Sequence, residues 1–75
     1  MTSGMLWLDS DRQRSLEEKV DRAARYYQQK YGRRPNLCLV WRGLLAEEKE
    51  IEAIRVMPVT NMVRDHFLLG VNTPN

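Results

Sequence analysis

The side chains best suited to catalytic chemistry are one thiol and one imidazole. Cys38 is the only cysteine and His66 the only histidine, so a nucleophile and its base would have to combine these two residues. Cys38 lies within the apolar run 37–40, where burial disfavours the thiolate and leaves the sulfur unreactive. We therefore expect Cys38 to pack in the core, and we expect the chain not to be an enzyme.

Carboxylates are the remaining candidates for holding a metal ion. No acidic residue stands at a diagnostic metal-ligand spacing from His66. Asp9 and Asp11 follow the apolar run 5–8 and could hold a hard cation at the end of a strand. The same Asp-Ser-Asp pattern is also typical of turns and helix caps, and no glycine-rich phosphate loop accompanies it. The sequence thus favours capping here and indicates no metal, no cofactor and no small-molecule substrate.

Basic residues gather in one third of the chain, with Tyr26 and Tyr27 among them. Guanidinium groups can bind phosphates while an aromatic ring stacks on a base, which is the chemistry of nucleic-acid binding. Acidic residues 17, 18 and 21 lie in the same segment and weaken its positive electrostatic potential. The sequence therefore favours a solvated helix surface here. The alternative is a contact with a nucleic acid or another anion through Arg22, Arg25, Arg33 and Arg34.

The charge is distributed unevenly along the chain although the net charge is only +2. Residues 1–42 hold nine Lys/Arg and five Asp/Glu, which gives +4, and residues 43–75 hold three and five, which gives −2. Two differently charged halves permit head-to-tail self-association or a weak contact with a polyanion.

One helix is predicted for residues 16–31. Ser15 and Glu18 form a capping-box pattern at its start, and apolar residues then recur at spacings of three and four. Gly32 supplies a left-handed stop, and Pro35 prevents continuation.

Apolar runs predict strands on both sides of this helix and two more after it. The runs cover residues 5–8, 36–41, about 54–57 before Pro58, and 66–71. Strand, helix and strand in succession form a βαβ unit with parallel strands, which would make Trp7 and Trp41 neighbours across the sheet. The expected fold class is α/β or α+β: a small two-layer domain with one main helix on a mixed sheet. Residues 44–52 fit either a short exposed helix or a loop.

The chain has room for one domain, residues 1–75, with flexible ends at 1–4 and 72–75. Its apolar runs are far shorter than the roughly 20 residues that span a bilayer, so no membrane segment is expected. A lone cysteine fits the cytoplasm.

A core this small and an apolar last strand favour an interaction module that homodimerises or docks on another protein. The residues expected at such an interface are Trp7, Trp41, His66 and Phe67. The alternative function is a small nucleic-acid-binding accessory protein that uses the basic helix surface.

Overall fold

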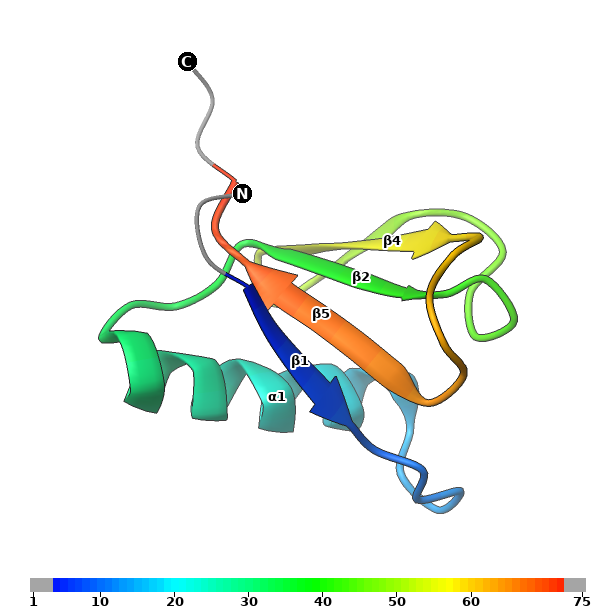
Figure 1. Cartoon of the computed structure of the whole chain (residues 1–75), viewed down its shortest axis with the longest axis horizontal. Coiled ribbons are helices and arrows are strands. Elements are labelled where there is room, and N and C mark those ends of the chain that lie inside the picture. The colour runs from blue at the N-terminus through cyan, green and yellow to red at the C-terminus, as the bar shows by residue number, and fades with distance from the viewer. Residues whose placement is uncertain (1–3, 73–75) are drawn as a thin grey trace.

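The computed structural model describes residues 4–72 and shows one helix packed on one face of a five-stranded sheet (Figure 1). In chain order the elements are β1 (Gly4–Leu8), α1 (Leu16–Tyr31), β2 (Leu37–Trp41), β3 (Lys49–Ile51), β4 (Ile54–Val59) and β5 (His66–Gly70). The predicted two-layer fold with a mixed sheet is confirmed.

Helix α1 begins and ends where its capping residues require. Ser15 Oγ accepts a hydrogen bond from the Glu18 amide at 3.1 Å, and the Ser15 amide donates to Glu18 Oε1 at 3.1 Å. Gly32 has φ 78°, a left-handed conformation that glycine adopts without steric cost, and its amide donates to the Gln28 carbonyl at 2.8 Å. The predicted helix and both of its ends are confirmed.

The strand order of the sheet is β1-β5-β2-β4-β3. β1 and β2 are parallel, but β5 lies between them and is antiparallel to both. The prediction that Trp7 and Trp41 occupy neighbouring strands is therefore wrong. The physical reason is that β5 carries Phe67 and Leu69, both fully buried, and an interior strand position provides that burial.

Residues 49–51 form β3, so three strands rather than two follow the βαβ unit. β3 pairs antiparallel with β4 through a two-residue turn at Glu52 and Ala53, whose φ angles are 49° and 66°. Positive φ at both positions is the geometry of a type I′ hairpin turn, for which Asn-Gly is the usual sequence. Glu-Ala carries no such signal, which explains why the hairpin was not predicted.

Pro58 lies within β4 and does not end it, contrary to the prediction. β3 pairs only with residues 54–56, so the later part of β4 has a hydrogen-bonded neighbour on one side only, β2. A proline is tolerated where a strand is unpaired on one side.

The core lies between α1 and the sheet. It is formed by four helix residues, by strand residues and by Val71 just after β5, all nearly inaccessible to solvent: Val20, Ala23, Ala24, Tyr27, Cys38, Val40, Ile51, Ile54, Val56, Phe67, Leu69 and Val71. Of the two ends expected to be flexible, Gly4 belongs to β1 and Asn72 exchanges hydrogen bonds with Asn36 at 2.7 and 3.0 Å. Residues 1–3 and 73–75 lie outside the described residues.

Candidate interaction surface

The face of the sheet opposite α1 carries a continuous apolar row. Register pairs Leu6 with Leu68, Leu68 with Leu39, and Leu39 with Met57, so the row crosses four adjacent strands. Leu6 is 62% exposed and the other three are half-buried. Within residues 4–72, no helix or strand covers this face (Figure 1). A sheet face turned to water normally carries polar residues, so this row marks a surface suited to a partner.

A second set of residues widens the apolar surface toward the ends of β1, β2 and β4. Leu8, 60% exposed, is paired with His66, and Trp41 is paired with Val59. His66 is half-buried, with its Nδ1 2.9 Å from the Arg64 carbonyl oxygen. We refer to the residues of both sets as the open face: Leu6, Leu8, Leu39, Trp41, Met57, Val59, His66 and Leu68.

The surface becomes polar at the β3 side of the sheet. Arg55 is exposed there, is paired in register with Glu50, and lies 3.9 Å from the Glu48 carboxylate. An apolar centre with a charged margin is the usual anatomy of a protein interface.

Trp41 is fixed by its surroundings. The Arg64 guanidinium lies over its ring at 5.2 Å from the centroid, and the Leu44 amide donates to its carbonyl at 3.0 Å. A Cβ at position 43 would collide with the indole, so only glycine permits this packing. The ring is therefore held rigidly at the end of β2.

Two of the predicted interface residues lie on the other face. Phe67 is completely buried beneath α1, and Trp7 packs against Tyr26 with ring centroids 4.5 Å apart. The structure brings Trp41 and His66 together on the open face but places Trp7 and Phe67 on the helix side. Alternate residues of a strand point to opposite faces, so two adjacent residues such as His66 and Phe67 cannot share one.

The free edges of the sheet belong to β1, to β3 and to the part of β4 that extends beyond β3, while the apolar last strand β5 is an interior strand. β3 is short and carries Lys49 and Glu50, which are residues that discourage edge pairing. β1 has no charged residue and no proline. Pro58 removes a donor from the free part of β4, so β1 is the edge best suited to pairing, and the apolar strand β5 has no free edge.

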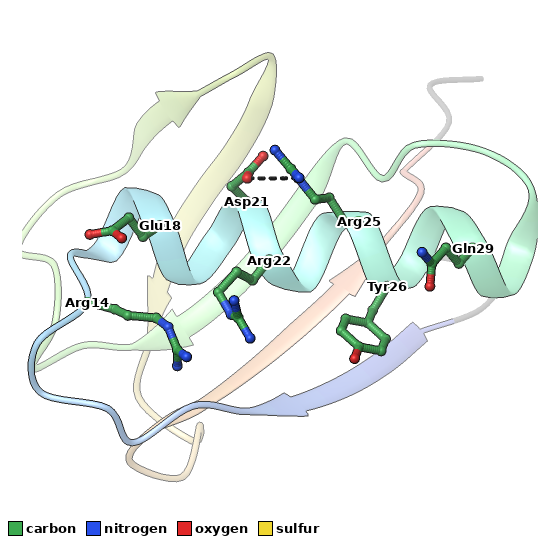
Figure 2. Close-up of a pocket in the computed structure, with 7 residues that line it drawn as sticks. All are labelled: Arg14, Glu18, Asp21, Arg22, Arg25, Tyr26 and Gln29. Carbon is green, nitrogen blue, oxygen red and sulfur yellow. Dashed lines mark ion pairs between the residues drawn. The ribbon is translucent and has the colours of Figure 1, made fainter.

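The predicted anion contacts do not form one site. Arg22 and Arg25 line a shallow groove along α1 together with Arg14 and Tyr26 (Figure 2). In this groove Arg25 Nε lies 3.0 Å from Asp21 Oδ2, the dashed contact of Figure 2, which offsets one of its cations.

Arg33 and Arg34 lie beyond the other end of the helix. Arg22 and Arg33 are eleven residues apart, which corresponds to about 16 Å along a helix axis. Arg34 is already 3.8 Å from the Glu52 carboxylate. The four arginines thus separate into two pairs.

Cys38 and His66 cannot act together, because they project from opposite faces of the sheet. Cys38 is buried under α1, and burial raises the pKa of its thiol to about 12. Among residues 4–72 no group of three or more histidine, cysteine, aspartate or glutamate side chains is placed to hold a metal ion.

Asp9 and Asp11 organise the turn that leads into α1. Asp9, only 6% exposed, accepts from the Asp11 amide at 3.1 Å and from Arg14 Nη1 at 3.2 Å. Asp11 accepts from the Gln13 amide at 2.9 Å. Both carboxylates are engaged in the turn, in agreement with the capping role predicted for them.

The apolar row was not recognised in the sequence, although a signal was present. Leu37, Leu39 and Trp41 alternate with Cys38 and Val40, and a continuous apolar run of this kind is typical of a strand that is covered on both faces. β2 is central, but only one of its faces is covered.

Comparison with family models, with curated proteins and with solved structures gave no match for this chain. No helix in the described part of the chain has the length and apolar character needed to cross a bilayer.

Proposed function

We propose that this protein is a small interaction module that forms a homodimer by packing the open face against the same face of a second copy. The observation that carries the proposal is the apolar row of Leu6, Leu68, Leu39 and Met57 on a face without a covering element. Burying that row removes apolar surface from water, which is the main driving force of protein association.

A second copy suits this face better than a charged partner does. The centre of the open face carries no carboxylate, lysine or arginine, and the charged residues Arg55 and Glu50 stand together at its margin. A two-fold axis through the centre would place apolar rows in contact and keep both margins in water. Such a partner also supplements the small core of a 75-residue chain.

The size of the face predicts a weak dimer. Its four strands, about 4.8 Å apart and about five residues of about 3.3 Å long, span roughly 14 by 17 Å before side-chain relief is counted. Two such faces bury less than the roughly 1,200 Å² of the smaller specific interfaces, so we expect association to depend on protein concentration.

The test is the molar mass of variants measured by light scattering after size exclusion. Leu6→Lys and Met57→Lys each introduce a charge into the row, and both should convert the dimer to a folded monomer. Val63→Lys is the matched control, because Val63 is 64% exposed in the loop between β4 and β5, outside the row.

The two row variants also distinguish face packing from edge pairing. Leu6 belongs to the edge strand β1, whereas β4 and its Met57 lie three strands away. Pairing through the β1 edge would be disrupted by Leu6→Lys and would survive Met57→Lys, and that result would refute the face-to-face arrangement.

A second candidate, nucleic-acid binding, is favoured by the groove in which Arg14, Arg22 and Arg25 flank Tyr26 (Figure 2). Phosphate-driven binding weakens steeply with salt. Fluorescence anisotropy of labelled duplex DNA and single-stranded RNA at about 50 and 200 mM salt should then show binding that Arg22→Gln reduces more than Arg33→Gln does. The absence of binding at the lower salt would eliminate this function.

The proposal places the module in the cytoplasm and assigns it no catalytic role. A single buried thiol leaves the chain without an intrachain disulfide, which fits a reducing compartment.

A further inference from the structure

A second hollow lies at the end of the sheet where the parallel strands β1 and β2 finish and β5 begins. It measures about 600 Å³, and basic side chains dominate its lining: Arg12, Arg14, Lys19 and Arg64, with Trp41 as an aromatic wall and Asp65 as the only carboxylate. The carboxyl ends of parallel strands, near a helix N-terminus, are where open sheets with helices commonly bind ligands. We call this hollow the basic cleft.

Lys19 is the most unusual residue of the basic cleft. It is 7% exposed, yet its ammonium makes no hydrogen bond or ion pair with any residue of the described range 4–72. Two other cations at this end of the molecule do have anionic partners: Arg14 is bound by Asp9, and Lys49 donates to Glu17 at 3.0 Å. The Lys19 ammonium is not among the fully buried polar atoms of residues 4–72, so the stem is buried while the charged end reaches the solvent in the cleft. Lys19 thus presents to the cleft a cation that no carboxylate neutralises.

The other cations of the cleft add to this unneutralised charge. Arg14 is already neutralised by Asp9 and Asp11, at 3.2 and 3.4 Å. Arg12 and Arg64 form no ion pair within residues 4–72, and the Arg64 guanidinium is held over the Trp41 ring. Three cations without an anionic partner thus face a single lining carboxylate, that of Asp65.

We propose that the basic cleft binds a small phosphate-bearing molecule, with Lys19 donating to the phosphate oxygens from the floor and Arg12 and Arg64 from the sides. A tetrahedral phosphate dianion matches a compact set of ammonium and guanidinium donors. A long nucleic-acid strand fits less well, because the segment that follows Leu44 at the cleft wall carries the glutamates 47, 48, 50 and 52.

The experiment is a titration of the ¹⁵N-labelled protein with inorganic phosphate and then pyrophosphate, at constant ionic strength balanced with sodium chloride. Saturable amide shifts are expected at residues 10–14, 19 and 64–65. Lys19→Met keeps the apolar stem and removes the charge, and it should weaken phosphate binding by more than about tenfold. Lys30→Met, an exposed lysine on the same helix, should leave it unchanged.

Folding and specificity are checked in the same samples. The Lys19→Met variant should melt close to the temperature of the wild type, because it keeps the apolar stem, which is the buried part of the side chain. Equal phosphate affinity in wild type and Lys19→Met would overturn the proposal, as would the absence of saturable shifts. Binding of a DNA duplex that displaces phosphate from the cleft and is lost in Lys19→Met would show a polymer ligand and would also overturn it.

Discussion

Single residues show how burial and pairing set the chemistry of this protein. Cys38 is packed under α1, so its sulfur belongs to the core, and burial holds the pKa of the thiol at about 12 against an ordinary 9.0. Lys19 is the opposite case: its stem is almost equally buried, but its ammonium reaches solvent and has no partner among residues 4–72. A buried side chain can thus be inert or can bind a ligand, and the presence or absence of a partner for its polar group distinguishes the two cases.

The thiol should make stability depend on pH in the alkaline range. Its pKa is raised on folding, so the stabilisation is complete below pH 9, where both states hold the proton, and is lost between pH 9 and about 12, because only the unfolded chain has then released it. Urea unfolding at several pH values should show a steeper alkaline loss in the wild type than in Cys38→Ala. Identical slopes would place the thiol in a more polar environment than its position implies.

The buried carboxylate of Asp9 should stabilise the turn before α1. Asp9→Asn keeps an acceptor for the Asp11 amide but removes the ion pair with Arg14, and we expect a loss of about 1–2 kcal/mol in the free energy of unfolding. Asp21→Asn breaks the more exposed pair with Arg25 and should cost no more than about 0.5 kcal/mol. Denaturant unfolding measures both, and equal losses would contradict the distinction between the two pairs.

Elements that are specified by local chemistry could be predicted from the sequence. Helix α1 has a capping box at Ser15 and a glycine stop at Gly32, and both of its ends were placed correctly. The strand order was not predictable in the same way, because insertion of β5 between β1 and β2 depends on which apolar strands pack best under α1. The open face could not be predicted either, because it depends on the strand order that aligns Leu6, Leu68 and Leu39.

The hairpin between β3 and β4 offers a test at the scale of an element. Ala53 has φ 66°, a conformation that costs a residue with a Cβ roughly 1–2 kcal/mol. Ala53→Gly should therefore raise the free energy of unfolding by about 0.5–1 kcal/mol after the added flexibility of glycine in the unfolded chain is subtracted.

Ala46→Gly is the control for this prediction. Ala46 lies in the exposed loop before β3 and has no positive φ, so glycine there should be neutral or slightly destabilising. Thermal melts give the stability of both variants relative to the wild type. A destabilised Ala53→Gly variant would contradict the type I′ turn.

The whole molecule has two surfaces with different chemistry at adjoining positions. The open face is apolar and suits a second copy, while the basic cleft is cationic and suits a phosphate group. Trp41 belongs to both, because its ring lines the cleft and its strand position lies on the open face. Dimerisation and anion binding are thus expected to influence one another through Trp41 and the Arg64 guanidinium above it.

Sedimentation equilibrium of the wild-type protein over a wide range of concentrations tests the central claim most directly. The monomer mass is 8.9 kDa, and face-to-face pairing predicts a rise with concentration to 2 × 8.9 = 17.8 kDa and no higher, because a two-fold contact closes. A mass that stays at 8.9 kDa up to the highest concentration would contradict dimerisation through the open face.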